Sequence, residues 1–265
     1  MQNLRYVGNN LFVEKLSIKN ILKKNKTPFY IYSESQIAFN FLKFANTFKK
    51  TDPLICFAAK SNSNLNILRV LGKLGAGADV VSGGELLKAL KAGIRPNKIV
   101  FSGVGKTEEE LKIAINKKIL LINCESESEA KLVNNLSKKL RKKVSIGFRL
   151  NPNVDAETHK NISTGKAENK FGLSIKNFKV FLKTVKSFKN VKLDALSVHI
   201  GSQILNDAPF RKTLNVMSKL IKELRLNLKY VDLGGGFGIN YTDKEKPINL
   251  SKYSKMVHNF SKKLN

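Results

Sequence analysis

Several residues that could bind and activate a carbonyl compound follow short apolar runs, where strands of a parallel sheet would end. They are Lys60 after "LICFAA", Asp79 and Ser82 in "ADVVS", Arg149 and Asn151 in "VSIGFRLN", His199 and Ser202 after "LDALSV", and Gly234, Gly235 and Gly236 after "LKYVDL". The carboxyl ends of parallel strands meet on one face of a barrel, so we expect these residues to meet there.

Lys60 is a candidate nucleophile. Apolar residues precede it, and desolvation disfavours the ammonium form of a lysine and lowers its pKa. Such an amine can attack a carbonyl carbon and form a Schiff base. Alternatively, Lys60 extends its charged end into solvent.

The stretch "DLGGGFG" offers consecutive backbone N–H groups without a Cβ to keep an anion away, as in a phosphate cradle. A tightly packed turn is the alternative. His199 supplies a ring that could stack on a ligand or be structural, and Ser202 supplies a hydroxyl that could join the cradle. A phosphate-bearing aldehyde would use the amine, the ring and the cradle together, which indicates pyridoxal phosphate.

Short β-branched or aromatic runs alternate with segments of helical period, a pattern typical of βαβ units. It predicts eight strands, the first being "PFYIYS" at 28–33. A dinucleotide fingerprint is not formed, because "GAGADV" and "GGGFGI" lack the last glycine. "GVGKT" likewise lacks the spacing of a phosphate-binding loop. We therefore favour a (β/α)₈ barrel over an open sheet.

Composition indicates a globular protein of 265 residues with 42% hydrophobic residues. The net charge of +28 raises the possibility of nucleic-acid binding, but the lysines are spread over most predicted helices. Cys56 and Cys124 lie in apolar runs, and neither a disulfide framework nor a metal site is predicted. With no signal-peptide pattern and no membrane-spanning run, we expect a cytoplasmic protein.

Five segments of the sequence together resemble a known family. The segments "FAAKSNSN", "GADVVSGGEL", "RLNPNVDAETHKNISTGKAENKFG", "HIGSQI" and "DLGGGFG" resemble, in this order, the diaminopimelate decarboxylases of the fold-type III pyridoxal-phosphate group, which includes alanine racemase. The resemblance implies that Lys60 carries the cofactor, His199 stacks on it, and Ser202 and glycines 234–236 hold its phosphate. It also implies that Asp79 and Arg149 line the site and that Lys170 lies near an active site shared between subunits.

The implied reaction is decarboxylation of meso-diaminopimelate to L-lysine and CO₂ by a homodimer. The resemblance also implies that residues 1–35 pack with a separate β-domain and that residues 36–265 form the barrel. A last barrel strand with an acidic "EPGR"-type motif, and the β-domain beyond it, are not found before Asn265. We therefore expect seven barrel strands and a chain that is part of a longer enzyme.

Two other functions remain open at this point. One is a non-catalytic pyridoxal-phosphate carrier, because small carriers of this fold group are single barrels. "HIGSQ" and the "ISTGKAENKFG" segment favour the decarboxylase. The other is a basic nucleic-acid-binding protein, which tight sequence-selective binding at physiological salt would support.

Overall fold

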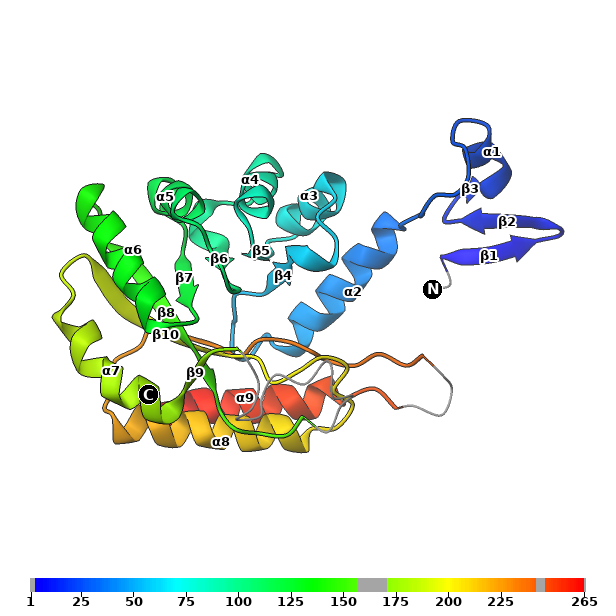
Figure 1. The fold of residues 1–265 in the computed structure, drawn as a ribbon. Helices are drawn as coiled ribbons and strands as arrows, with labels where there is room; N and C mark the ends of the chain where they lie inside the picture. Colours follow the sequence, from blue (N-terminus) through cyan, green and yellow to red (C-terminus); the bar gives the residue numbers. More distant parts are fainter. Residues whose placement is uncertain (1–2, 157–170, 242–245, 265) are drawn as a thin grey trace.

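A computed structural model describes residues 3–156, 171–241 and 246–264. In Figure 1 a small N-terminal unit stands apart from the main sheet, beyond the first turn of α2. The unit is an antiparallel sheet of three strands and one short helix, and α2 leads from it to the main sheet: β1 (Leu4–Val7), β2 (Asn10–Val13), β3 (Leu16–Ser17), α1 (Ile18–Leu22) and α2 (Glu34–Thr47).

The main sheet is parallel and curled, with the strand order β11-β10-β8-β7-β6-β5-β4 and a short strand β9 beside β8. Consecutive strands are neighbours, as in a barrel. The bounds are β4 (Cys56–Ala58), β5 (Gly77–Val80), β6 (Ile99–Phe101), β7 (Leu121–Cys124), β8 (Val144–Asn151), β9 (Leu173–Ser174), β10 (Val191–Val198) and β11 (Tyr230–Asp232).

Helices follow the strands and cover the outer face of this sheet (Figure 1). They are α3 (Leu65–Lys73), α4 (Gly83–Lys91), α5 (Glu108–Lys117), α6 (Glu127–Lys139), α7 (Ile175–Ser187), α8 (Ala208–Glu223) and α9 (Leu250–Leu264), with 3₁₀ turns η1 (Ala59–Ser61) and η2 (Pro96–Lys98). The hydrophobic core fills the space between sheet and helices, with Phe101, Phe148 and Phe178 fully buried.

Side-chain caps set the starts of the helices after β6 and β7. Thr107 and Glu110 form a reciprocal capping box at α5, and Ser126 accepts a hydrogen bond from the backbone of Glu129 at α6. Hydroxyl residues followed by acidic ones, as at these two positions, are typical of helix starts. Such caps fix where each strand-to-helix loop ends and therefore where its side chains lie.

The predicted fold class is confirmed as a barrel that is not closed. In the described sheet β4 and β11 are the two edges, and each has one neighbour. The first of the eight predicted strands is wrong: residues 28–33 form no strand, since Pro28 lacks an N–H donor and Tyr30 and Tyr32 are exposed. The other seven predicted strands correspond to β4, β5, β6, β7, β8, β10 and β11.

Candidate active site at the carboxyl ends of the strands

Lys60 lies in the 3₁₀ turn directly after β4, at the carboxyl end of the sheet. Its side chain is exposed, so of the two environments that the sequence left open, desolvated or extending into solvent, the structure shows the second. The reason is topological: β4 is an edge strand, and β5 covers it on one side only. The charge of Lys60 still acts on both Asp79 and His199, which places the three groups at the same end of the barrel.

The loops after β10 and β11 lie side by side, as the predicted phosphate cradle requires. The backbone of Ile204 donates a hydrogen bond to Gly236 O at 2.8 Å, and Gly238 N donates to Ile204 O at 3.0 Å. A Cβ on Gly236 would collide with the carbonyl oxygen of Gly201, next to Ser202. The two segments are therefore packed backbone to backbone, which only a glycine at 236 permits.

Gly235 differs from its two neighbours. Gly234 and Gly236 have positive φ angles of 65° and 89°, and a Cβ on either would strike the β10 side of the site. A Cβ on Gly235 would meet nothing within 4 Å. The space above Gly235 is thus open to a ligand, and any side chain there would enter it.

Aromatic packing anchors the far side of the glycine loop. Phe237 stacks on Phe210 of α8 with ring centroids 5.2 Å apart and contacts Tyr253 of α9 at 5.1 Å. Phe44 of α2 lies 5.7 Å from Phe237 on another side. The loop is therefore held by three helices, which limits its freedom to move when an anion binds.

His199 follows β10 directly and faces the glycine loop. Gly235 N donates a hydrogen bond to His199 Nδ1 at 3.3 Å. Burial, together with the positive charges of Arg149 and Lys60, lowers the pKa of His199 to about 4. At neutral pH the ring is therefore uncharged, with Nδ1 as an acceptor.

Asp79 of β5 is half-buried, and one of its two carboxylate oxygens is buried and unsatisfied. Its Oδ1 has no hydrogen-bond partner among the described residues. Burial raises the pKa of Asp79 to about 6, helped by the nearby charge of Asp232 and opposed by a hydrogen bond from Ser102 and by Lys60 and Arg149. A buried carboxylate with an unused oxygen is a group that a ligand could satisfy.

Arg149, at the end of β8, is held by residues that sequence reasoning gave no role. Its Nη1 donates to Glu125 Oε1 at 2.9 Å, while Glu125 Oε2 accepts from Gly172 N at 2.9 Å. The guanidinium also lies over the ring of Phe171, 4.8 Å from its centroid. Glu125 thus fixes Arg149 against the chain that enters β9.

A buried ion pair between Lys106 and Glu129 lies next to the backbone of Glu125. Lys106, whose side chain is fully buried, donates to Glu129 Oε1 at 2.7 Å, Gly103 O at 2.7 Å and Asn123 O at 2.8 Å. All three of its protons are therefore used. The other oxygen of Glu129 accepts from Glu125 N at 2.7 Å. This network ties the carboxyl ends of β6 and β7 together.

Sequence reasoning missed Lys106, Asn123, Glu125, Glu129 and Asp232. Signals existed for each: Lys106 lies in "GVGKT", which lacks the spacing of a phosphate-binding loop, and the two glutamates lie in "CESESE", directly after an apolar run. Asn123 is a polar residue inside the apolar run "LLINC", and Asp232 begins "DLGGGFG". A buried polar residue in an apolar strand was the signal to follow.

Two of the strand-end residues have local structural roles instead. Ser82 caps α4 by accepting a hydrogen bond from Glu85 N at 3.2 Å. Asn151 Oδ1 accepts from Asn153 N at 2.9 Å within its own turn. Lys170, predicted to lie near a shared active site, is outside the described residues.

The two cysteines are free and lie in β4 and β7, as predicted. Burial raises the pKa of Cys56 to about 12, with smaller contributions from the negative charges of Asp232 and Asp79. Burial also raises the pKa of the Cys124 thiol. Neither thiol is a nucleophile near neutral pH.

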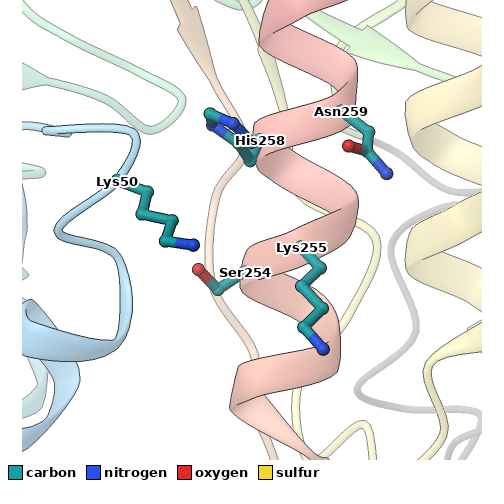
Figure 2. A pocket seen from close by; sticks show the side chains of 5 residues that line it. All are labelled: Lys50, Ser254, Lys255, His258 and Asn259. Atoms are coloured by element: carbon teal, nitrogen blue, oxygen red, sulfur yellow. The ribbon is translucent and has the colours of Figure 1, made fainter.

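A hollow of about 190 Å³ lies between the segment before β4 and helix α9. Figure 2 shows the side chains around it, from the segment before β4 and from α9: Lys50, Ser254, Lys255, His258 and Asn259. Lys50 precedes β4 whereas Lys60 follows it, so this hollow is not part of the candidate active site.

Comparison with known families now decides the family. Residues 34–264 match the family model described as pyridoxal-dependent decarboxylase, pyridoxal binding domain. The chain belongs to this family. The pyridoxal cofactor predicted from the sequence is thereby confirmed at the level of the family.

Its relatives are named diaminopimelate decarboxylase. One from Aquifex aeolicus is 42% identical over 246 residues, which are 92% of this chain and 58% of the relative. One from Helicobacter pylori is 43% identical over 247 residues, which are 91% of this chain and 60% of the relative. The chain thus spans about three fifths of the length of these relatives.

Solved structures agree. A Helicobacter pylori diaminopimelate decarboxylase complexed with L-lysine superimposes with a TM-score of 0.87 at 40% identity, covering 92% of this chain and 63% of that chain. A diaminopimelate decarboxylase from M. jannaschii in co-complex with L-lysine gives a TM-score of 0.89 at 34% identity, covering 99% of this chain and 63% of that chain. The predicted resemblance is confirmed. No helix in the described part of the chain has the length and apolar character to cross a membrane.

Proposed function

We propose that this chain forms the pyridoxal-phosphate-binding barrel of an enzyme that converts meso-diaminopimelate to L-lysine and CO₂. The observation that carries the proposal is the convergence of Lys60, His199 and the glycine loop on one end of the barrel in a chain of this decarboxylase family. Relatives in the same family are bound to L-lysine, which is what diaminopimelate becomes when one carboxylate leaves as CO₂.

The described residues fit the cofactor. The open space above Gly235 accommodates an anion, and Asp79 Oδ1 is an acceptor without a partner among the described residues. In this proposal Ser202 and glycines 234–236 hold the phosphate, and Lys60 attaches to the aldehyde carbon. When bound, pyridoxal phosphate supplies the electron sink for loss of CO₂.

The remaining side chains orient and tune the site. His199 presents an uncharged ring for stacking, because its pKa is about 4. Arg149, held by Glu125, and Asp79 line the site with fixed charges. Such preorganisation means that the protein does not have to reorient its dipoles during the reaction.

The whole enzyme is proposed to be a cytoplasmic homodimer with a second domain. Residues 3–47 contain no buried side chain, and Leu4, Tyr6, Leu16 and Tyr30 are exposed. This agrees with the proposed boundary at residue 35, with residues 1–35 packing against another domain. A strand from the remaining length of the enzyme would close the gap between β4 and β11.

The test is release of CO₂ from meso-diaminopimelate by a version extended to the length of the relatives, with Lys60→Ala as the control. We expect turnover of meso-diaminopimelate, little turnover of L-ornithine or L-arginine, and no turnover by Lys60→Ala. The chain of 265 residues alone should bind the cofactor without forming lysine. A different preferred substrate would contradict the proposed reaction. Robust lysine formation by the 265-residue chain would contradict the proposal that this chain needs the rest of the enzyme for catalysis.

A further inference from the structure

Asn123 is an unusual residue for its place. It lies in β7 between Ile122 and Cys124, which are fully buried, and is itself only 1% exposed. Its Oδ1 has no hydrogen-bond partner among the described residues. A buried amide oxygen without a partner destabilises a fold. An apolar residue would serve the core better, so the amide must have another use.

The neighbouring strand is adapted to this amide. Gly147 of β8 is paired with Asn123 in the sheet register. A Cβ on Gly147 would collide with Asn123 Oδ1. The glycine therefore makes the space in which the amide is oriented.

The amide nitrogen reaches across the barrel. Asn123 Nδ2 donates to Asp232 Oδ2 at 2.8 Å, although β7 and β11 are separated in the sheet by β8 and β10. It also contacts Ser102 Oγ at 3.3 Å. A hydrogen bond to a carboxylate is among the stronger ones in proteins. Asn123 therefore links β7 to the carboxyl end of β11 by a side-chain hydrogen bond.

Asp232, which Asn123 holds in place, also binds the glycine loop. Its Oδ1 accepts a hydrogen bond from Gly234 N at 2.9 Å, so the first glycine is tied to the carboxylate. Ser197 Oγ, in β10, also donates to Oδ2 at 3.1 Å. Donors on both oxygens fix the rotation of the carboxylate and with it the direction of the loop.

We propose that Asn123 is a positioning residue for the phosphate end of the cofactor, acting through Asp232 on the glycine loop. This inference rests on the proposed function. Asn123 itself does not touch the cofactor. Lys106, which donates to Asn123 O at 2.8 Å, holds the backbone from which the amide projects.

The experiment compares two ligands that differ only in the phosphate. Apparent dissociation constants of pyridoxal phosphate and of pyridoxal are measured by absorbance titration of the wild-type chain and of Asn123→Ala. We expect Asn123→Ala to weaken pyridoxal phosphate by about tenfold, the equivalent of one hydrogen bond to a charged group. Pyridoxal binding should be unchanged, because Lys60 is not affected.

Two serines give a matched pair of further variants. Ser197→Ala removes the second donor to Asp232 and should weaken pyridoxal phosphate by about threefold, as expected for a weaker neutral donor. Ser145→Ala removes the 2.5 Å hydrogen bond to Asp194 at the opposite end of the barrel and should change neither ligand. If thermal unfolding shows that Asn123→Ala does not fold, the test is whether Ser197→Ala weakens binding of pyridoxal phosphate but not of pyridoxal.

The outcomes separate this inference from the proposed function. If the wild-type chain binds neither ligand, the proposed function fails and the inference fails with it. If the wild type binds both and the two variants weaken both ligands equally, Asn123 has a structural role only. If neither variant changes the preference for the phosphorylated ligand, the inference alone is overturned.

Discussion

Asp79 and Asp194 are acidic residues in strands of the same sheet, but they lie at different ends of the barrel and their pKa values are shifted in opposite directions. Asp194, near the N-terminal end, accepts from Ser145 at 2.5 Å and lies 3.3 Å from both Lys192 Nζ and Lys229 Nζ. Burial raises the pKa of Asp194, but the hydrogen bonds from Ser145 and the lysines outweigh it and hold the pKa below its ordinary value.

Asp79, at the carboxyl end, has no ion-pair partner within reach among the described residues, and its pKa is raised to about 6, mainly by burial. The cations also differ: Lys192 and Lys229 are largely exposed, whereas Lys106 at the carboxyl end is fully buried. One end is thus electrostatically compensated, as in a purely structural region. The other keeps an uncompensated acid, which is typical of a functional site.

The largest effect should come from Lys106. Lys106→Met leaves Glu129 buried without its cation and removes the donor to two backbone carbonyls. Breaking a buried pair by removing one partner costs about 3–5 kcal/mol of unfolding free energy. Urea unfolding measures this loss. Adding Glu129→Gln to Lys106→Met should recover part of it, and an unchanged midpoint in Lys106→Met would show that the network is not structural.

Asp79 should have a smaller effect of opposite sign. Its folded pKa of about 6 is above the usual value near 3.9 in an unfolded chain, so the folded state binds more protons between these pH values. Stability attributable to Asp79 therefore falls as pH rises from about 4 to 6. Asp79→Asn should stabilise the protein at pH 7 by about 3 kcal/mol, since one pKa unit corresponds to about 1.4 kcal/mol, and by little at pH 4.

The difference between variant and wild type isolates Asp79. His199 acts in the opposite direction over the same range, because its pKa is lowered to about 4 and the folded state binds fewer protons there. Asp194→Asn is the contrasting variant: since the pKa of Asp194 is lowered, its removal should destabilise at pH 7. Equal signs for the two variants at pH 7 would remove the distinction between the two ends.

The smallest effect should come from Lys229. Its side chain is 57% exposed and lies 3.3 Å from Asp194. Exposed ion pairs contribute about 0.2–1 kcal/mol. Lys229→Ala should therefore lower the unfolding free energy by less than about 1 kcal/mol, and added salt should reduce the difference. A loss as large as that of Lys106→Met would mean that burial does not distinguish the two ends.

The positions of the strands and the end at which the site forms could be predicted from the sequence, because apolar runs and helix caps are local signals. Lys60, His199 and Gly235 were named as candidates in this way, and the structure places them at the same end of the barrel. The sequence left two environments open for Lys60, and the choice between them depends on β4 being an edge of the sheet. The link from Asn123 to Asp232 joins residues 109 positions apart and follows from the curl of the sheet, which no local pattern encodes.

The absence of a strand at residues 28–33 has a different cause. The pattern "PFYIYS" is typical of a strand, but Tyr30 and Tyr32 have no sheet to pack against among the described residues. Strand propensity is realised only on a surface that buries the side chains. The sequence therefore predicted the local tendency correctly and the outcome incorrectly.

The central claim is that the carboxyl end of this barrel holds pyridoxal phosphate through Lys60. The most direct measurement is borohydride reduction of the chain incubated with pyridoxal phosphate, followed by mass-spectrometric mapping of the modified peptide. We expect one dominant label on Lys60, which Lys60→Ala abolishes and Lys50→Ala, before β4, does not. Labels distributed over the exposed lysines, and unchanged in Lys60→Ala, would contradict it.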